Sequence, residues 1–451
     1  MAERTPATTA PGRGRSRSPA RRPHLRLVRA PARRTAAEAR RLARRDLGLL
    51  CGSAGALTVV GLVMVLSAGS VSAAQGYDGN SFWYFQRQVL YAGVGIGAGL
   101  FVARVSPRIW RGLGVPILAV AGVLMLIAAH PSSGTSLYGA SRWIDLGPIT
   151  LQPSELAKLA LLIWASAYLS KRAAPMTLQE LARPIGALAG IYCVLILAEP
   201  DLGTTVAIVV MLAAILLVSG TPPRPLLLAG GAASLVTIAA VWFEPYRRAR
   251  IFSFLNPWKD PQGAGFQIVQ ALIALASGGI FGSGLGNGVI KYNYLPEAHT
   301  DMILAVVGEE LGLVGITLVV AAYVALAWAG LNVALSCNDP FGKRLAAGIV
   351  ALVCGQALIN LAAVLGLAPL TGIPLPFISY GGSSLVIALV SVGILLNIAG
   401  AHAAAVEVPD RSRRDVRSRR AEPRRGGGAA AARRAGDVRG VAGPRRGAAR
   451  S

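Results

Sequence analysis

The chain has 451 residues, of which 53% are hydrophobic and only 15% are charged, and its formal net charge is +24. This composition excludes an ordinary soluble multi-domain protein and is typical of a chain that crosses a membrane several times. The charge lies mainly in the two ends. Residues 1–47 hold 14 Arg against 3 acidic residues, and residues 401–451 hold 14 Arg against 5, so these tails carry +11 and +9.

Both tails are rich in Ala, Gly, Pro, Ser and Arg and have no apolar periodicity, so we expect them to be disordered. Their Arg runs lack the interleaved aromatic residues that stack on bases, and we expect no nucleic-acid partner. Contact with anionic lipid is the simpler interpretation. The predicted organisation is a basic tail over 1–47, a membrane domain over 48–400 and a second basic tail over 401–451.

Apolar runs near the length of a membrane-spanning helix, roughly 20 residues, recur along the chain. We identify ten, at about 48–68, 88–104, 113–129, 155–170, 185–199, 203–220, 225–243, 302–328, 345–366 and 384–400. The first lacks a small-residue cleavage site, so we expect an uncleaved span rather than a signal peptide. The four cysteines have no metal-binding spacing, and neither a disulfide framework nor a structural zinc site is expected. The predicted fold is an all-α polytopic membrane protein.

With both tails in the cytoplasm, most Lys and Arg residues of the short loops lie inside, as membrane topology favours. A large extracytoplasmic loop then separates the seventh and eighth spans. Seven cations depart from this pattern and lie at the outer side: Arg142, Lys158, Arg247, Arg248, Arg250, Lys259 and Lys291. They favour a phosphate-bearing ligand there, because Arg and Lys are the usual donors to phosphate. Contact with outer lipid headgroups is the alternative.

The polar motif GASRWIDLGPITLQPSELAKLAL, residues 139–161, leads into the fourth span. Ser154 is expected to cap that helix, with Glu155 near the positive end of its dipole. Lys158 follows Glu155 by three residues, so the two share a face and are expected to pair. A capped helix with a structural ion pair would explain this motif without any ligand.

Three further segments have irregular backbone at or near membrane depth. EPDLG, at 199–203, joins two spans in almost no length, which indicates either a polar cavity or a tight turn capped by Asp201. SGGIFGSGLGNG, at 277–288, does not match the phosphate-binding GxxxxGK[ST] loop, so we expect flexible or close-packed re-entrant backbone rather than a nucleotide site. PLTGIPLPFISYGGSS, at 369–384, must line a cavity or be covered by protein.

The segment KYNYLPEAHTDMILAVVGEELG, at 291–312, gathers ionisable residues at the entrance of an apolar helix. Carboxylates at membrane depth are costly and indicate a functional site. Thr300 or Asp301 alone would be interpreted as a helix cap. Together with Glu309, Glu310 and the ionisable residues that precede Asp301, the pattern indicates a water-filled cavity.

Taken in order, GASRWIDLG, QPSELAKL, EPDLGTTV, RIFSFLNPW, YLPEAHTD, GEELGLVG and PLPFISYGGSSL resemble the motifs of the FtsW/RodA/SpoVE family, the SEDS proteins of bacterial cell-wall synthesis. The resemblance covers roughly residues 48–400. It implies a ten-span polymerase that joins units of lipid II, a lipid-linked disaccharide-pentapeptide, outside the membrane. It also implies a class B penicillin-binding protein transpeptidase and other membrane proteins of the division complex as partners.

The resemblance places the family's essential aspartate at Asp301. Ten further positions match residues that are important in the family, and we expect them to bind substrate: Arg142, Trp143, Glu155, Lys158, Arg250, Lys291, Glu297, His299, Ser379 and Gly381. The chain departs from the family pattern at Met302, Leu304 and Asn287-Gly288, which concern packing near the site. The first two spans and the long basic tails favour the division-specific FtsW branch over the RodA-like elongation proteins.

The reaction expected from the resemblance is an inverting glycosyl transfer with undecaprenyl pyrophosphate as leaving group. Asp301 is the expected base for the acceptor hydroxyl, and the outer-side cations are candidates to stabilise the pyrophosphate. No cofactor is certain, although a divalent cation would suit the leaving group. A lipid II flippase would use the same buried charges, and a scaffold of the division complex is a third hypothesis. The expected location is the cytoplasmic membrane at the septum, with both termini inside.

Overall fold

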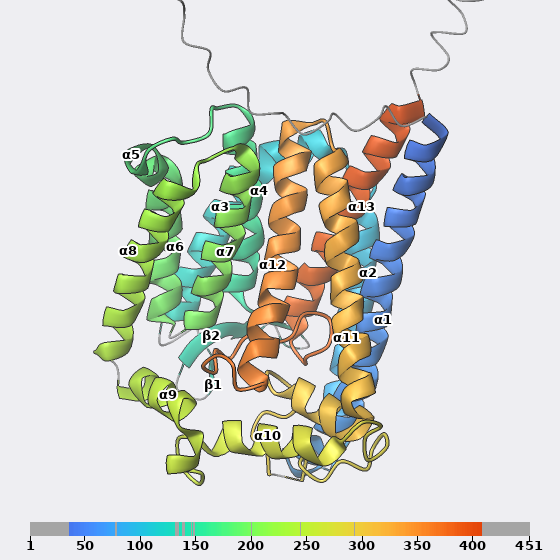
Figure 1. The fold of residues 1–451 in the computed structure, drawn as a ribbon, viewed down its shortest axis with the longest axis vertical. Coiled ribbons are helices and arrows are strands. Elements are labelled where there is room, and N and C mark those ends of the chain that lie inside the picture. The colour runs from blue at the N-terminus through green and yellow to red at the C-terminus, as the bar shows by residue number, and fades with distance from the viewer. Residues whose placement is uncertain are drawn as a thin grey trace, which may run out of the picture.

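The computed structural model describes residues 36–407, except residues 77–78, 131–134, 138–139, 146, 148, 200, 244 and 293. The predicted tails therefore lie largely outside the described residues. Within this range, long helices run side by side along one axis, and shorter elements cover one end of the bundle (Figure 1). We call the covered end the loop end. The opposite end, where the first helix begins and the last one ends, we call the basic end.

Each predicted span coincides with a helix of this bundle. These helices are α1 (Ala36–Gly76), α2 (Trp83–Val102), α3 (Pro107–Ala129), α4 (Pro153–Ser170), α6 (Ala187–Ala198), α7 (Leu202–Ser219), α8 (Pro223–Trp242), α11 (Ile303–Ser336), α12 (Pro340–Val364) and α13 (Gly382–Glu407). A short helix α5 (Leu178–Leu181) and a π-helical turn over Ala182–Gly186 precede α6. The first helix begins twelve residues before the expected end of the tail, so residues 36–47 are helical.

Among the described residues, seven helical stretches are long and apolar enough to cross a membrane: Arg41–Gly76, Pro107–Ala129, Leu178–Ala198, Leu202–Ser219, Ile303–Ser336, Pro340–Val364 and Gly382–Ala401. The other three predicted spans are α2, α4 and α8, which run beside them in the bundle (Figure 1). Helices α2 and α4 begin with polar turns, and α8 contains a shorter apolar stretch over Pro223–Ala239. The chain is a polytopic helical membrane protein, while a count of ten spans stays a prediction.

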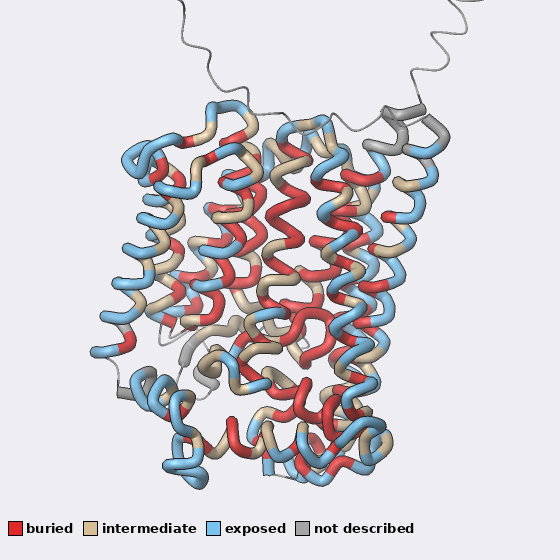
Figure 2. Tube along the Cα trace, in the orientation of Figure 1, coloured by how far each residue is buried: buried red, intermediate tan, exposed pale blue. Residues whose placement is uncertain are grey.

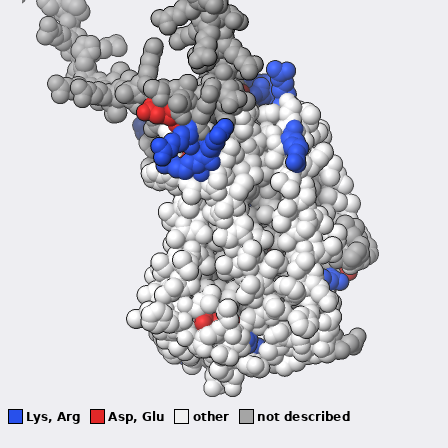
Figure 3. Space-filling view, turned by 90° about the vertical axis from the view of Figure 1, so that its right-hand side faces the viewer, with Lys and Arg blue, Asp and Glu red and all other residues white. Residues whose placement is uncertain are grey.

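The outside of the bundle is apolar between its two ends. Large side chains such as Leu227, Leu235 and Trp328 are exposed around the helices, whereas buried residues concentrate between them (Figure 2). On the face drawn in Figure 3, most Lys and Arg side chains gather near the basic end, and a wide uncharged belt lies below them. Lipid tails solvate such a belt without the hydrogen bonds that charged groups require.

Two groups of short elements form the loop end. Helices α9 (Pro245–Leu255) and α10 (Phe266–Gly278), joined by a 3₁₀ turn at Pro257–Lys259, lie across the end of the bundle in the long loop between α8 and α11 (Figure 1). Three strands, β1 (Thr135–Leu137), β2 (Ala140–Asp145) and β3 (Thr150–Leu151), form an antiparallel sheet in the order β1-β2-β3. This small sheet is the exception to the predicted all-α class among the described residues.

Local helix signals were predicted with mixed success. Of the two hypotheses for residues 199–203, a polar cavity or a capped turn, the second predicted Asp201 as the cap of α7. Asp201 does cap this helix, because its Oδ1 accepts the backbone N–H of Thr204 at 2.9 Å. The prediction that Ser154 caps α4 was wrong. The helix begins at Pro153, and Gln152 occupies the cap position. Proline favours the first helical position because its backbone already has helical φ and needs no N–H partner there. At α11 the cap position belongs to Met302 rather than to Thr300 or Asp301.

Candidate active site

Asp301 lies at the loop end, two residues before α11 begins. Its backbone carbonyl oxygen accepts a hydrogen bond from Nδ2 of Asn360 on α12 at 2.7 Å. The Thr300 hydroxyl lies 3.4 Å from Oδ1 of Asp301 and 3.1 Å from Oε2 of Glu297. The backbone of this segment is thus held by α12, and Asp301 as a residue is partly exposed although its carboxylate is desolvated.

The surroundings of Asp301 make its carboxylate a better base than an ordinary aspartate. Burial raises the pKa of Asp301 from 3.8 to about 6, the Arg250 guanidinium opposes this shift, and the Glu297 carboxylate adds to it. Arg250 belongs to α9, so the long loop brings a cation to the entrance of α11. A group with this pKa is ionised at neutral pH and still accepts a proton readily.

Glu297 and His299 lie on the same turn as Asp301. Glu297 has a positive φ of 54°, an uncommon conformation for a residue with a side chain, and its carbonyl oxygen accepts the Thr300 N–H at 3.0 Å. The buried His299 ring lies 4.1 Å from the Tyr84 ring, centroid to centroid. Burial lowers the pKa of His299, and Glu297 opposes this. The structure therefore brings three of the predicted residues together, with a desolvated imidazole among them.

The segment over residues 369–381 forms a wall beside this turn. The Tyr380 N–H donates to the His299 carbonyl oxygen at 2.9 Å, and Nδ2 of Asn360 also donates to the Ile373 carbonyl oxygen at 2.9 Å. Ser379 is buried, and its hydroxyl accepts the Leu375 N–H at 2.7 Å. In this structure Ser379 shapes the wall. Gly381 is partly exposed at the start of α13.

A second acidic group lies at the turn between α6 and α7. Glu199 is only 3% exposed, and neither of its carboxylate oxygens has a hydrogen-bond partner among the described residues. Burial and the nearby Asp201 raise the pKa of Glu199 to about 8, against the lowering effect of Arg142. Arg142 and Trp143, both half-buried, belong to β2. This strand therefore brings a predicted cation towards the carboxyl group of Glu199, in a segment for which the sequence left a polar cavity and a capped turn as alternatives.

The two acidic groups share the wall over residues 369–381. A Cβ atom added at Gly203 would lie 2.2 Å from Cγ1 of Ile373, so the start of α7 touches this wall directly. Ile373 is also the residue whose carbonyl oxygen Asn360 binds together with that of Asp301. A glycine is required at 203 for this close approach. The Glu199 turn and the Asp301 segment therefore flank one common structural element.

Glu155 and Lys158 form the expected ion pair on α4. Nζ of Lys158 lies 2.7 Å from Oε1 of Glu155, and both side chains are buried. The predicted pairing is confirmed. The ammonium of Lys158 does not reach the surface in this structure, so a contact with substrate would require α4 to move.

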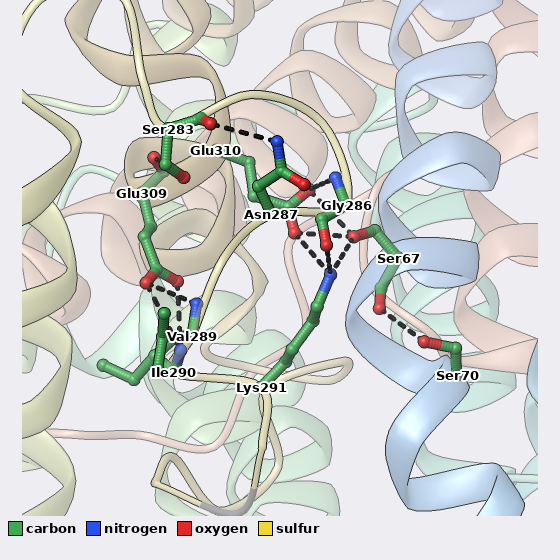
Figure 4. Close-up of polar contacts among 10 residues, drawn as sticks. All are labelled: Ser67, Ser70, Ser283, Gly286, Asn287, Val289, Ile290, Lys291, Glu309 and Glu310. Carbon is green, nitrogen blue, oxygen red and sulfur yellow. Dashed lines mark hydrogen bonds and ion pairs between the residues drawn. The ribbon is translucent and has the colours of Figure 1, made fainter.

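Lys291 is held in a buried network rather than displayed in a cavity. Its ammonium donates to Oε1 of Glu310 at 2.9 Å, to the Ser67 hydroxyl at 3.1 Å and to the Gly286 carbonyl oxygen at 2.6 Å (Figure 4). Three bonds use all the donors of an ammonium group. The Ser67 hydroxyl also donates to Oε1 of Glu310 at 2.6 Å. In this arrangement Lys291 joins the long loop to α11 and α1.

Glu309, near a break in α11, binds the backbone directly after the glycine-rich segment. Its carboxylate accepts the N–H groups of Val289 at 2.8 Å and Ile290 at 3.3 Å (Figure 4). The helix is interrupted at Gly312, with φ of 65° and ψ of −163°, and the next N–H, of Leu313, donates to the Gly279 carbonyl oxygen at 3.0 Å. The prediction of close-packed backbone in this segment is confirmed.

Several residues of this framework were not singled out from the sequence. Asn360 had a usable signal, since it is a polar side chain within an apolar run, and such residues in membrane helices are seldom incidental. Ser67 had none, because a serine among small residues is common in these helices. Within the described part of the chain, no group of three or more His, Cys, Asp and Glu residues is placed to hold a metal ion.

Comparison with known proteins identifies the family of this chain. The sequence profile of the FtsW/RodA/SpoVE family, described as cell cycle proteins, matches residues 48–403. The chain belongs to this family. The matched region coincides with the predicted membrane domain.

Two relatives and one solved structure illustrate the similarity. The chain is 42% identical over 360 residues to the probable peptidoglycan glycosyltransferase FtsW of Geobacter metallireducens, covering 79% of this chain and 94% of the relative. It is 38% identical over 344 residues to stage V sporulation protein E of Bacillus subtilis, covering 76% and 93%. A solved structure described as a peptidoglycan synthase complex that coordinates polymerization and crosslinking has a TM-score of 0.63 and 28% identity, covering 78% and 97%.

Proposed function

We propose that this protein is a peptidoglycan glycosyltransferase that polymerises lipid II into glycan strands, as an FtsW-like enzyme of septal wall synthesis. Asp301 provides the main observation in support, because the residue is partly exposed, its carboxylate interacts with Arg250, and burial raises the pKa of that carboxylate to about 6. The relatives named as peptidoglycan glycosyltransferases share the whole membrane domain. In this proposal the loop end faces the outside, and both termini lie in the cytoplasm.

The proposed reaction forms one bond and breaks one. The hydroxyl of the acceptor sugar attacks the anomeric carbon of the donor while its proton passes to Asp301. The bond between the anomeric carbon and the phosphate oxygen breaks, and its electron pair leaves with undecaprenyl pyrophosphate. Attack from the face opposite the leaving group inverts the α-linked phosphate to a β-linked sugar. The reaction requires a base on one side and cationic groups on the other.

Arg250 and Arg142 are the arginines that we assign to the leaving pyrophosphate. Both interact electrostatically with carboxyl groups of the site, Arg250 with Asp301 and Arg142 with Glu199. Guanidinium groups bind phosphate oxygens through paired hydrogen bonds and stabilise the charge that develops on them. Trp143 adjoins Arg142 and would pack against the substrate.

The other residues of the predicted set have supporting roles in this proposal. Glu297 and His299 fix the turn that carries Asp301, while Ser379 and Gly381 shape the wall beside it. The Glu155–Lys158 pair and Lys291 hold the surrounding helices in place. A divalent cation that accompanied the pyrophosphate would lie between substrate oxygens and the acidic groups, and no step requires it here.

A class B penicillin-binding protein is the proposed partner. The similar solved structure is described as a synthase complex that coordinates polymerization with crosslinking, and this supports a transpeptidase partner. Other divisome membrane proteins are proposed as neighbours, and anionic lipid as the contact of the basic tails. A RodA-like elongation role is the alternative, and the location of a tagged protein at the septum or the side wall distinguishes the two.

Reconstituted polymerisation tests the proposed activity. Purified protein with its partner is placed in liposomes, lipid II is added from outside, and glycan chains are measured by electrophoresis. Asp301→Asn should abolish polymer while its thermal melting stays near that of the wild type. Asp260→Asn, an exposed acid of the same loop, is the matched control and should retain activity. Wild-type polymer from Asp301→Asn would overturn the assignment, and leaflet transfer of lipid II without polymer would favour a flippase.

A further inference from the structure

A cavity of about 230 Å³ opens at the basic end of the bundle, far from the proposed active site. It lies between the beginning of α3 and the end of α4. Six of the residues that line it decide its chemistry: Arg111, Val115, Trp164, Tyr168, Lys171 and Arg172. None of them belongs to the predicted set of site residues, and the proposed reaction uses none of them.

The shape of the cavity follows from the packing of α3 on α4. At Gly114 the two helices touch, because an added Cβ atom there would lie 3.0 Å from the Cα atom of Trp164. Towards the basic end, larger side chains line the cavity between the two helices, among them Arg111 on α3 and Tyr168 on α4. The rings of Trp164 and Tyr168 stack at 5.4 Å with an interplanar angle of 21° and form a flat wall. On the other side Val115 is exposed towards the apolar belt.

The polar side of the cavity is cationic and rigid. Nη2 of Arg111 donates to both carboxylate oxygens of Asp339 at 2.9 and 3.0 Å, which fixes the guanidinium, and its buried Nε has no hydrogen-bond partner among the described residues. The Arg172 guanidinium lies over the Tyr168 ring, 4.5 Å from its centroid. Nη1 of Arg172 also donates to the Tyr168 hydroxyl, so this ring holds the guanidinium while its other N–H groups remain available to a ligand.

The charges of the cavity do not balance. Three cations line the cavity: Arg111, Lys171 and Arg172. Of these, Arg111 pairs with a carboxylate, that of Asp339, whose Oδ2 also accepts the Gly342 N–H at 3.0 Å as the cap of α12. Lys171 is exposed and makes no ion pair within the described residues. An excess of about two positive charges remains in a cavity with an aromatic wall and an apolar opening. Such a cavity matches an anion that carries an apolar chain.

We propose that this cavity binds an anionic phospholipid of the adjoining leaflet. Its headgroup phosphate would lie among Arg111, Lys171 and Arg172, and an acyl chain would follow Val115 along α3. A free phosphate would make the same charge contacts with the three cations, but it has no acyl chain to contact the apolar opening. The excess of cations and the route to the lipid belt favour the lipid. The proposal does not depend on the glycosyltransferase activity.

Thermal melting of the full-length protein in neutral detergent tests this proposal. Phosphatidylglycerol, phosphatidylcholine and inorganic phosphate are titrated in separate series, and the rise in melting temperature is recorded. Phosphatidylglycerol should raise the melting temperature at the lowest concentration. The variant Lys171→Ser/Arg172→Ser should need about tenfold more phosphatidylglycerol for the half-maximal rise, since two partly exposed charge contacts are lost.

A matched control removes the same charge at the same end of the bundle. Arg104→Ser/Arg108→Ser changes two exposed arginines that do not line the cavity, and its response should equal that of the wild type. An equal loss in both double variants would show general surface attraction and overturn the proposal, as would an equal rise with inorganic phosphate. Ala167→Trp fills the cavity without changing its charge, so a folded Ala167→Trp protein that keeps the full response would also overturn it.

Discussion

Nδ2 of Asn360 donates a hydrogen bond to the backbone carbonyl oxygen of Asp301 at 2.7 Å. The same nitrogen donates to the Ile373 carbonyl oxygen at 2.9 Å. One amide group on α12 therefore fixes the segment that carries the proposed base to the wall that also touches the Glu199 turn. The position of the proposed base therefore depends on a buried side chain of another helix.

Removal of the Asn360 amide should reduce turnover more than substrate affinity. Asn360→Leu removes both hydrogen bonds, and a shift of about 1 Å in the Asp301 segment would lower kcat roughly 100-fold with KM changed less than about threefold. Steady-state polymerisation with purified protein measures both constants. Asn332→Leu, on α11 at the basic end, is the matched control and should leave both unchanged. A loss confined to KM would contradict a positioning role.

The polymerisation rate should depend on pH through Asp301. The base must be ionised, and its pKa is raised to about 6, so the rate should rise as the pH increases through about 6. Arg250 lowers this pKa, so Arg250→Gln should move the acid limb of the pH–rate profile to higher pH. Arg248→Gln, an exposed arginine on the same helix, should leave the limb in place. An unchanged acid limb in the pH–rate profile of Arg250→Gln would contradict the influence of Arg250 on the pKa of Asp301.

The Lys291–Glu310 pair should behave as a structural ion pair. Lys291→Met leaves the fully buried Glu310 carboxylate without its cation, which should destabilise the fold by about 3–5 kcal/mol. Lys291→Met/Glu310→Gln removes the uncompensated charge as well and should recover most of the stability and the polymerising activity. Thermal melting and the polymerisation assay measure the two effects.

The double variant also decides between two roles of Lys291. If Lys291 binds pyrophosphate, the neutral Met and Gln side chains of the double variant cannot take over that role. A stable but inactive double variant would therefore favour the substrate-binding role predicted from the sequence. Lys259→Met, an exposed lysine in the same loop, is the control and should be nearly neutral in both assays.

Glu199 should make the protein less stable at alkaline pH. Its pKa is raised from 4.5 to about 8, so the folded state holds the proton more tightly than the unfolded state. Stability from this group is therefore lost as the pH rises from 4.5 towards about 8. Glu199→Gln should show a flatter dependence of melting temperature on pH, whereas Glu180→Gln, an exposed acid, should follow the wild type. Parallel curves for Glu199→Gln and the wild type would contradict a buried neutral Glu199.

Features that depend on neighbours along the chain were predictable. The apolar runs predicted every helix of the bundle, because a membrane helix satisfies its backbone internally and needs only sufficient apolar length. The Glu155–Lys158 pair and the Asp201 cap were predicted for the same reason, since three residues of helix place the groups within reach. Ser154 was a wrong prediction because Pro153 competes for the same helix start.

Features that depend on contacts between distant segments were not predictable. The residue pattern and the family resemblance together marked Asp301 and Lys291 as members of one polar path, yet they have different surroundings. Asp301 is partly exposed near Arg250, whereas Lys291 is enclosed by Glu310 and by Ser67, which lies 224 residues away in the chain. The sequence determined which ionisable residues enter the membrane domain, because hydropathy and local spacing suffice for that. Only the tertiary structure decided which of them remain available for chemistry, since a buried charge takes whatever partner the packing of distant helices brings to it.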